Sequence, residues 1–437
     1  MAELWTNWAG NQRALVEVLR PTTEAELCAL VVGAAQKGQR VKAVGAGHSF
    51  TDAALTDGLL LSLEDYGRVL SLEVPADGGD GFVTVQAGAR LQELSGYLWS
   101  RGLAFENLGD IDVQTLAGAT STATHGTGGA FRNLSANIVG MRIITGSGEV
   151  LECDEGTNAE LLRVARVGIG ALGLISTITL RVVPAFHLRV VEKPRRYDEV
   201  IEGFDDLVAD NDHFEFFYVP HTDWTLTKRN QRNLEPIEPR SRLAAWQQDM
   251  LWSNHAFGLV NRVAAARPSL TPRLARLVPS SGEVHYNDRS YRVFASPRKV
   301  RFVEMEYAVP LEATTAALAE VRGWIDSTGS PTMFPVEVRA VAGDDIPLST
   351  AHGRPTGYIA VHVYRGTPHE TYFRAVESIM RAHGGRPHWG KMHFRTAADL
   401  APDYPDWDAF QAVRQANDPD GVFANAYTDR VLGPVGT

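Results

Sequence analysis

The sequence is poor in cysteine, with two in 437 residues, and carries fewer basic than acidic side chains, 42 against 52. Cys28 and Cys153 lie far apart and outside any CxxC spacing, which predicts neither a disulfide framework nor a cysteine zinc site. The net charge of −10 argues against a surface built to bind the phosphate backbone of nucleic acid. No apolar run of about 18 residues occurs, and the first residues lack the basic and apolar regions of a signal peptide. We therefore expect a cytoplasmic protein with no transmembrane segment and no nucleic-acid partner.

Hydrophobic residues make up 44% of the chain, enough to build the cores of two domains. Thr23 and Glu26 have the spacing of a capping box and predict a helix that begins there. The short β-prone run at 40–44 predicts a strand at a sheet edge, followed by a glycine loop. The mixture of helical and strand patterns predicts an α+β fold, with a first domain over residues 12–185, a second over 186–385 and a C-terminal segment over 386–437.

Three stretches are rich in glycine and small residues: "AVGAGHSFTDAALTDG" at 43–58, "LAGATSTATHGTGGAF" at 116–131 and "VGIGALGLIST" at 167–177. Gly45 and Gly47 leave backbone N–H groups free to surround an anion, and two such loops can hold one pyrophosphate. The nicotinamide fingerprint G-x-G-x-x-G is incomplete, because Phe50 stands where its third glycine would be. The simpler alternative is that these glycines serve tight turns only.

These stretches together resemble the FAD-dependent aldonolactone oxidoreductases, which belong to the vanillyl-alcohol-oxidase type of flavoprotein. "VGAGHSFTDAALTDG" resembles the first phosphate loop of that family, "AGATSTATHGTG" its second, and "GALGLISTITL" the entry of its flavin-side strand. "RPHWGK" and "NAYTDRVLG" resemble its C-terminal signature. The resemblance covers nearly the whole chain. It implies a two-domain FAD-binding fold of the PCMH type, an α+β substrate (cap) domain and a C-terminal segment that returns to the flavin and completes the active site.

The resemblance implies that His48 is the histidine that many members join covalently to the C8-methyl group of the flavin. A neutral imidazole is a good nucleophile near pH 7, although a loop histidine more often only makes hydrogen bonds. His125, in the second loop, is expected to be structural or phosphate-adjacent. The remaining FAD-binding residues implied by the resemblance are Val44, Gly45, Ala46, Gly47, Ser49, Thr115, Gly118, Ala119, Ser121, Thr122, Ala123, Gly126, Gly173, Ile175, His388 and Lys391.

The substrate side is predicted from "FPVEVRAVAGDD", where Glu337 and Arg339 are two residues apart and share one strand face, opposite Val336. From spacing alone this pair could equally be a solvated strand face. The resemblance implies that Glu337 holds a substrate hydroxyl and that Arg339 lies near the flavin. It also implies that Lys391 lies near the reactive hydroxyl and that His362 is close to the substrate.

His388 and His393 flank Lys391 and could suggest a metal site, but no acidic third ligand with a recognisable spacing accompanies them. We therefore expect no metal at this segment. Trp389, between His388 and Lys391, is expected to be a packing residue.

The implied reaction is oxidation of a sugar 1,4-lactone, L-gulono-1,4-lactone or a related aldonolactone, by hydride transfer from a hydroxyl-bearing carbon to flavin N5. The alternatives are an alditol or polyol oxidase producing H2O2, a nicotinamide-linked dehydrogenase, and a flavin-fold binding protein without turnover. Ala123 stands where related oxidases carry glycine, and a methyl group near the flavin would hinder O2. We therefore expect electrons to pass to a quinone or cytochrome in preference to O2.

Overall fold

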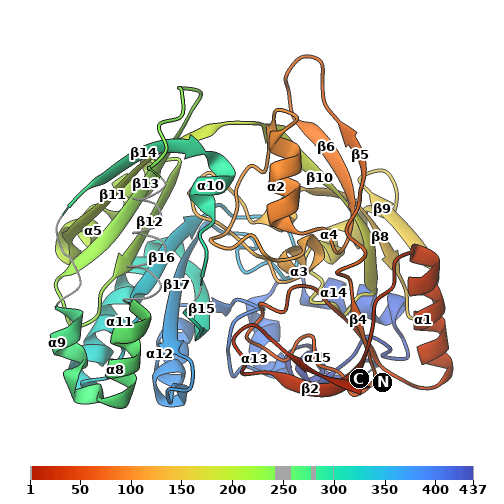
Figure 1. The fold of residues 1–437 in the computed structure, drawn as a ribbon. Coiled ribbons are helices and arrows are strands. Elements are labelled where there is room, and N and C mark those ends of the chain that lie inside the picture. Colours follow the sequence, from red (N-terminus) through yellow and green to blue (C-terminus); the bar gives the residue numbers. More distant parts are fainter. Residues whose placement is uncertain (1, 242–256, 277–281, 299, 437) are drawn as a thin grey trace.

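The computed structural model describes residues 2–241, 257–276, 282–298 and 300–436. Its helices and sheets form two lobes, and this confirms the predicted α+β class. The N-terminal half forms the lobe drawn in red to yellow on the right of Figure 1, and residues from about 187 onward form the green-to-blue lobe on the left. The last helices, drawn in blue, return to the side of the N-terminal lobe.

A four-stranded sheet opens the first lobe, in the order β1-β2-β4-β3. Strands β2 (Arg13–Leu19), β4 (Leu59–Ser62) and β3 (Val41–Val44) are parallel, and β1 (Ala2–Thr6) is antiparallel to β2. Because β1 pairs with β2, the first lobe extends N-terminally of residue 12, where the sequence places the start of the domain.

Helix α1 (Glu24–Gln36) begins at the predicted capping box, in which Thr23 and Glu26 satisfy each other's backbone N–H groups. Gly38, at φ +63°, follows the helix and lets the chain turn into β3. Strand β3 lies at the edge of its sheet, as predicted, so the glycine loop that follows it starts from an edge where a ligand can lie against the backbone.

The second sheet of the first lobe has the order β5-β6-β10-β8-β9, and β7 pairs with β10. Its strands are β5 (Val69–Glu73), β6 (Gly81–Gln86), β7 (Leu103–Ala104), β8 (Ile138–Ile144), β9 (Val150–Asp154) and β10 (Leu174–Pro184). The helices of this part are α2 (Leu91–Trp99), α3 (Leu116–Ser121) and α4 (Ala159–Ala165).

The second lobe is built on an eight-stranded sheet in the order β14-β11-β13-β12-β16-β17-β15-β18, with every neighbouring pair antiparallel. The strands are β11 (His187–Arg196), β12 (His213–Tyr218), β13 (Trp224–Asn233), β14 (Val284–Arg289), β15 (Phe302–Pro310), β16 (Val336–Val341), β17 (Thr356–Tyr364) and β18 (Arg386–Pro387). The helices are α5 (Tyr197–Glu202), α6 (Phe204–Ala209), α8 (Phe257–Ala266), α9 (Thr271–Ala275), α10 (Ser290–Phe294), α11 (Thr314–Thr328) and α12 (Glu370–Ala382).

Side chains alternate between the two faces of this sheet. Phe216, Met305, Val338 and Val361 point to one face and are fully buried in an apolar cluster with residues of α5, α6, α11 and α12. The opposite face, which we call the inner face, is turned toward the first lobe, since Arg339 on that face pairs with Asp110 and Glu306 with His125. The alternation therefore sends the charged residues of β12, β15, β16 and β17 to the boundary between the lobes.

The C-terminal segment connects both lobes. Strand β18 pairs with β15 at the edge of the eight-stranded sheet. Helices α13 (Ala397–Leu400), α14 (Trp407–Asn417) and α15 (Ala426–Leu432) then place Phe410 and Tyr427 in the apolar core of the first lobe. Residues 388–392 thus cross the boundary between the lobes.

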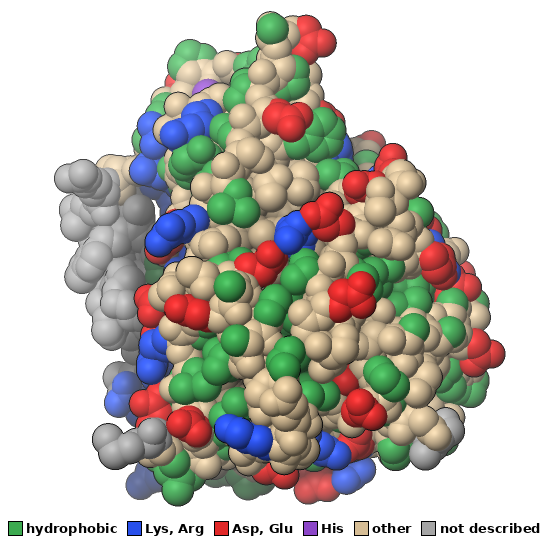
Figure 2. Space-filling view, turned by 90° about the vertical axis from the view of Figure 1, so that its right-hand side faces the viewer, with side chains coloured by type: hydrophobic (Ala, Val, Ile, Leu, Met, Phe, Trp, Pro, Cys, Tyr) green, Lys and Arg blue, Asp and Glu red, His purple; other side chains and the backbone are tan. Residues whose placement is uncertain are grey.

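Figure 2 shows the side of the molecule that lies on the right of Figure 1, and among its described residues Lys and Arg are interspersed with Asp and Glu. This distribution differs from the clustered basic stripe of a nucleic-acid-binding surface. Within the described parts of the chain, no helix is both long and apolar enough to span a membrane.

Candidate functional site

One cavity in the first lobe brings the three predicted glycine-rich stretches together and encloses about 1040 Å³ of space between atoms, part of it open to solvent. Sequence reasoning missed several wall residues, among them Trp5, Lys42, Gln114 and Phe423. The predicted cofactor residues that line the cavity are Val44, Gly45, Ala46, Gly47, His48, Ser49, Thr115, Gly118, Ser121, Thr122, Gly173 and Ile175.

The glycines of the first two loops are required by close approach. A Cβ atom on Gly45 would lie 2.0 Å from Oγ1 of Thr115, and one on Gly118 would lie 3.0 Å from the same atom. Gly47 has φ +67°, which an L side chain rarely adopts, and a Cβ there would lie 3.3 Å from the Trp5 ring. The loops therefore form one continuous backbone surface, and this shape fits a long ligand with a phosphate group between them.

Five predicted cofactor residues do not line this cavity. Ala119 and Ala123 are fully buried in the core of the lobe. Gly126 packs against Leu108, and a Cβ atom on Gly126 would lie 2.3 Å from the Leu108 carbonyl oxygen. His388 and Lys391 lie at the boundary with the second lobe, where they contact β15. Wall and core residues lie next to each other in the sequence here, because helix α3 buries Leu116, Ala119 and Thr120 whereas Gly118 and Ser121 line the cavity.

His48 lies on the cavity wall, with its ring stacked on Trp8 at a centroid distance of 5.3 Å and an interplanar angle of 22°. Burial lowers the pKa of His48 to about 4, and the positive charges of Lys391 and Arg90 act in the same direction. The imidazole is therefore neutral at pH 7, the form in which a ring nitrogen is nucleophilic.

Lys42 also lines the cavity, and its Nζ donates a hydrogen bond to the Gly170 carbonyl over 3.0 Å. Burial lowers the pKa of Lys42 to about 7, and the charge of Arg414 adds to this while Asp418 opposes it. The Lys42 side chain on this wall thus changes between its charged and neutral forms near pH 7.

The inner face of the eight-stranded sheet carries a cross-strand row of charges. Lys228 on β13 pairs in register with Glu215 on β12, and Glu215 pairs with Arg339 on β16. In the next row Glu337 is opposite Ala360, which in turn is opposite Glu306 on β15. Neighbouring strands thus place charges side by side that lie far apart in the sequence.

Arg339 is the centre of this group. Its Nη2 lies 2.6 Å from Asp110 and its Nε 3.1 Å from Glu215, and Nη2 also contacts Glu337. Asp110 belongs to the first lobe, so this ion pair crosses the boundary between the lobes. Although burial raises the pKa of Asp110, Arg339 and Arg298 hold it at about 2. Arg339 therefore stays charged and is fixed from both lobes.

Glu337 has fewer cationic partners than Asp110 and Glu215, the other two carboxylates that contact Arg339. Asp110 also pairs with Arg298, and Glu215 with Lys228, whereas the cation in contact with Glu337 is the shared Arg339. Burial raises the pKa of Glu337 to about 8, because Arg339 offsets only part of it and Asp110 and Glu215 add repulsion. Glu337 can therefore exchange a proton near neutral pH.

Lys391 and His362 meet at Glu304. Nζ of Lys391 lies 2.5 Å from one carboxylate oxygen of Glu304, and Nε2 of His362 lies 3.4 Å from the other. His362 is also 4.0 Å from Glu337, and the Lys391 ammonium lies 5.4 Å from the centre of the Phe50 ring. The four predicted catalytic residues therefore belong to one connected group, although they come from β16, β17 and the C-terminal segment.

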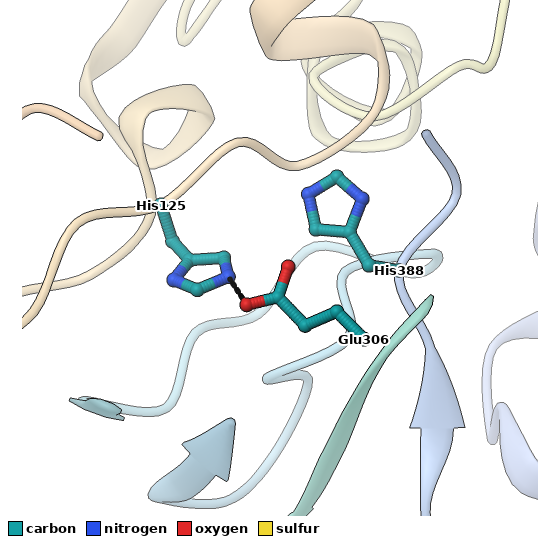
Figure 3. Close-up of side chains that lie close together, drawn as sticks. All are labelled: His125, Glu306 and His388. Atoms are coloured by element: carbon teal, nitrogen blue, oxygen red, sulfur yellow. Dashed lines mark ion pairs between the residues drawn. The ribbon is translucent and has the colours of Figure 1, made fainter. Parts of the chain in front are cut away.

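A second group joins the lobes at His125, Glu306 and His388 (Figure 3). Nε2 of His125 lies 3.3 Å from Glu306, and the His125 ring stacks on Tyr358 with a centroid distance of 3.6 Å. His125 therefore connects the second glycine loop to β15 and has the structural character that its sequence context predicts.

The ligand atoms of this group lie within 4.8 Å of one another, a spacing that a metal ion could bridge. Nδ1 of His388 accepts a hydrogen bond from the Gly390 N–H over 3.0 Å, so its neutral ring carries the proton on Nε2. Burial lowers the pKa of His388 to about 3 and keeps that ring neutral. This hydrogen-bond arrangement favours a His125–Glu306 ion pair over metal ligation. His393 lies elsewhere, with Nε2 3.3 Å from the Tyr427 hydroxyl, and Trp389 is fully buried, as expected of a packing residue.

Sequence reasoning missed four charged residues of the inner face, Glu215, Lys228, Glu304 and Glu306, and also Asp110 of the first lobe, which pairs with Arg339. A signal existed for two of them, because "VEMEYAV" places Glu304 and Glu306 two residues apart in an otherwise apolar strand, as Glu337 and Arg339 are. Glu215 between phenylalanines carried a weaker signal. Asp110 lies in a loop, and no periodicity marks it.

Two sequence-family models match the chain. The model described as D-arabinono-1,4-lactone oxidase matches residues 178–431, and the model described as FAD binding domain matches residues 17–154. Among individual relatives, L-gulono-1,4-lactone dehydrogenase of Mycobacterium tuberculosis is 48% identical over 99% of this chain and 100% of its own. L-gulonolactone oxidase of Bos taurus is 33% identical over 98% and 97% of the two chains. D-arabinono-1,4-lactone oxidase of Eremothecium gossypii is 27% identical over 96% and 93%.

Among solved structures, cholesterol oxidase from B. sterolicum superposes with a TM-score of 0.81 and covers 99% of this chain and 97% of its own. A solvent-stable cholesterol oxidase gives a TM-score of 0.82. At 17% and 19% sequence identity, these two structures support the two-domain fold and carry no information about the substrate.

Proposed function

Because this chain belongs to the FAD-dependent aldonolactone oxidoreductases, we propose that it oxidises L-gulono-1,4-lactone or a closely related aldono-1,4-lactone and passes the electrons to an acceptor other than O2. The family assignment makes it an FAD enzyme that acts on CH–OH groups. The relatives that cover the whole chain are named lactone dehydrogenases or oxidases, so a polyol oxidase is not favoured. The choice of lactone and of acceptor is our proposal.

The observation that carries the proposal is the connected group on the inner face. Glu337 and Arg339 on β16, His362 on β17 and Lys391 from the C-terminal segment form contacts that run through Glu304. A carboxyl group, a guanidinium, an imidazole and an ammonium can together hold several hydroxyl groups and the ring oxygen of a sugar lactone. This polar set faces the lobe whose glycine loops fit a dinucleotide, as the reaction requires.

Each residue then has a separate task toward the substrate. Glu337 accepts a hydrogen bond from a substrate hydroxyl and, in its ionised form, can take the hydroxyl proton. Lys391 and Arg339 place positive charge where the oxygen becomes negative, which is worth about 4 kcal/mol per charge at 4 Å and an effective dielectric constant of about 20. His362 orients a neighbouring hydroxyl. When bound, FAD supplies the acceptor for the two electrons and the hydrogen that leave the C–H bond.

The residues of the glycine loops would hold the cofactor. Cβ atoms at Gly45, Gly47 and Gly118 would come too close to Thr115 or Trp5, so the loops present bare backbone here. Backbone N–H groups can bind an anion, and this supports a diphosphate bound between the loops. We assign His48 the covalent bond to FAD, since its ring is neutral, lies on the cavity wall and is fixed by Trp8.

Ala123 supports the proposed preference against O2. It is fully buried and has φ +58°, a conformation that is unfavourable for alanine by about 1–2 kcal/mol and that glycine adopts freely. The chain thus keeps a methyl group at a position where the backbone favours glycine. Ala123 lies in the core and follows Thr122 of the cavity wall, and we interpret its methyl group as a barrier to O2 that approaches the cofactor through this wall. We infer a quinone or cytochrome as acceptor. Two free thiols, Cys28 and Cys153, support the reduced environment of the cytoplasm as the location.

The function is tested by mixing the purified enzyme anaerobically with candidate substrates and recording the FAD absorbance. We expect L-gulono-1,4-lactone and related aldono-1,4-lactones to bleach the flavin, whereas alditols of the same carbon number bleach it at least tenfold more slowly. Faster bleaching by an alditol would reassign the substrate class, and no bleaching by any sugar derivative would overturn the enzymatic assignment.

The covalent role of His48 is tested by acid precipitation. We expect the yellow colour to stay with the wild-type pellet and to move to the supernatant in His48→Ala, because the variant lacks the nucleophile. Free FAD in the wild-type supernatant would contradict the covalent bond while leaving tight binding intact. His393→Ala, which removes a buried histidine elsewhere in the structure, serves as the control and should keep its colour in the pellet.

The raised pKa of Glu337, about 8, predicts that kcat/KM rises with pH to a plateau above about pH 8. The ionised carboxylate is the form that takes the hydroxyl proton, so the protonated form at lower pH is less active. Glu337→Gln should lower kcat/KM by about 10²–10⁴-fold and lose this limb of the profile. A Gln variant that keeps the limb would show that another group titrates.

The same pKa shift has a consequence for stability. Between the unfolded pKa, about 4.3, and about 8 the folded protein holds a proton on Glu337 that the unfolded chain releases, so this group makes the free energy of unfolding fall as pH rises through that window. Chemical denaturation of wild type and Glu337→Gln across pH 5–9 checks this sign independently of activity. The Gln variant should lack this contribution to the slope.

The role of Ala123 is tested by Ala123→Gly. We expect reoxidation of the reduced enzyme by O2 to become at least tenfold faster, with a melting temperature equal to or above that of the wild type because the backbone strain is relieved. Stopped-flow reoxidation and an oxygen electrode measure the first effect. Ala119→Gly, which removes a buried methyl group from the same loop at a helical position, is the matched control and should not gain oxygen reactivity. Equal reoxidation rates in all three proteins would refute the barrier.

A further inference from the structure

Strand β15 carries two buried carboxylates that the mechanism above does not use. Glu304 and Glu306 lie two residues apart on the inner face, and they are 5% and 4% exposed. Met305, between them, points to the opposite face and packs in the apolar cluster. Burying an ionised carboxylate destabilises the fold unless a cation and hydrogen bonds compensate for the lost water. Each of these two residues is therefore expected to have such a partner.

Glu304 has two partners, and both are predicted substrate-site residues. One carboxylate oxygen lies 2.5 Å from Nζ of Lys391, and the other lies 3.4 Å from Nε2 of His362. Nδ1 of His362 faces the Pro335 carbonyl at 3.4 Å, so Nε2 is the nitrogen directed at Glu304. A single carboxylate therefore bridges an ammonium and an imidazole that come from different parts of the chain.

The backbone of β15 also binds residues 388–392, the segment that carries Lys391. The carbonyl of Glu304 accepts a hydrogen bond from the Met392 N–H over 2.9 Å, directly after Lys391. The carbonyl of Glu306 accepts one from the His388 N–H over 3.0 Å, directly before the Trp389–Gly390 pair. Residues 388–392 are thus held against β15 at both ends, and the side chain of Glu304 fixes Lys391 between these two bonds.

The Lys391 side chain is partly accessible. It is 22% exposed, whereas that of Glu304 is 7% exposed. The carboxylate of Glu304 covers one side of the ammonium, and the Phe50 ring lies 5.4 Å away on the first lobe. An ammonium has three donor hydrogens, so the bond to Glu304 leaves donors available to a substrate.

We propose that Glu304 is a positioning residue of the substrate site, whose carboxylate bridges Lys391 and His362 and holds the ammonium charged and directed at the substrate hydroxyl. The inference rests on the proposed function, in which Lys391 stabilises negative charge on that hydroxyl. Glu304 acts through its two partners and does not contact the reacting atoms.

The electrostatic surroundings of Lys391 make Glu304 its dominant partner. Burial lowers the pKa of Lys391, but Glu304, followed by Glu306 and Glu337, raises it above its ordinary value. Among the described residues, the charged and titratable groups that act on Lys391 or Glu304 are Glu306, Glu337, His362, His48, His388 and Asp110. Among the carboxylates of the described residues, Glu304 is the one within ion-pair distance of the Lys391 ammonium, at 2.5 Å. Loss of its charge should therefore allow Lys391 to lose its proton at lower pH.

The first test is Glu304→Gln, which keeps the size of the side chain and removes its charge. We expect kcat/KM for the lactone to fall by about 10–100-fold, the cost of a misplaced catalytic group. At pH values above the plateau set by Glu337, kcat/KM should fall where Lys391 loses its proton, and this alkaline limb should lie at least one pH unit lower in the variant. The absorption spectrum of bound FAD, recorded against pH without substrate, should show the same downward shift. FAD content and melting temperature establish that the variant is the folded holoenzyme.

The second test asks whether Glu304 acts through its two partners. In a background that lacks both, Lys391→Met with His362→Ala, Glu304→Gln should change kcat/KM by no more than about twofold, because the groups that transmit its effect are gone. A Glu304→Gln effect that keeps its full size in this background would overturn the proposal, since it would assign Glu304 a role separate from Lys391 and His362.

A conservative variant and a matched control separate positioning from general stability. Glu304→Asp keeps the charge on a shorter side chain, and it should restore the alkaline limb while kcat/KM stays reduced. Glu377→Gln is the control, because Glu377 is also a buried carboxylate that contacts β15 through the Tyr307 hydroxyl at 2.6 Å and the C-terminal segment through the Phe394 N–H at 2.8 Å. Glu377→Gln should leave the alkaline limb at its wild-type pH, whatever its effect on melting temperature.

The outcomes distinguish this inference from the proposed function. A wild-type enzyme whose FAD no lactone reduces would refute the proposed function and the inference with it. An active wild type with an unshifted alkaline limb in Glu304→Gln would refute the inference alone. If Glu304→Gln does not fold, Glu304→Asp decides, because kcat/KM equal to wild type in that variant would exclude a positioning role.

Discussion

The arrangement of the two lobes depends on the balance of buried charges at the inner face of the eight-stranded sheet. Asp110, Glu215 and Glu337 surround Arg339, and Glu304 holds Lys391. Charges removed from water are tolerated only when they are paired, and breaking one buried pair typically costs about 3–5 kcal/mol. Because Asp110 belongs to the first lobe, the pairing that satisfies the buried charges also connects the lobes.

The chain uses two different surfaces for the two ligands of the proposed reaction. The proposed cofactor cavity is lined largely by backbone and small side chains, since Thr115 leaves no room for a Cβ atom on Gly45 and little room for one on Gly118. The proposed substrate surface is formed by long charged side chains of the eight-stranded sheet together with Lys391. Backbone N–H groups suit a diphosphate of constant shape, whereas side chains on strands can hold particular hydroxyl groups in fixed positions.

Much of the fold and part of the site could be predicted from short sequence patterns. Thr23 and Glu26 predict the start of α1, and the spacing of Glu337 and Arg339 predicts their common face on β16. The same spacing rule applied to Glu304 and Glu306 would have placed two more charged residues on the inner face. Ala119 and Ala123 could not be separated from the wall residues beside them, because the direction of each side chain depends on how α3 packs in the core.

The sequence by itself determined the local features of this protein: where helices begin, which loops can approach a ligand through glycine, and which strand residues share a face. These follow from interactions between residues a few positions apart. The tertiary structure alone decided which charges meet. Arg339 and Glu215 are 124 residues apart in the chain, and Asp110 reaches Arg339 from the other lobe. Strand order and lobe packing come from long-range burial of apolar faces, and the identity of each buried ion pair follows from that order.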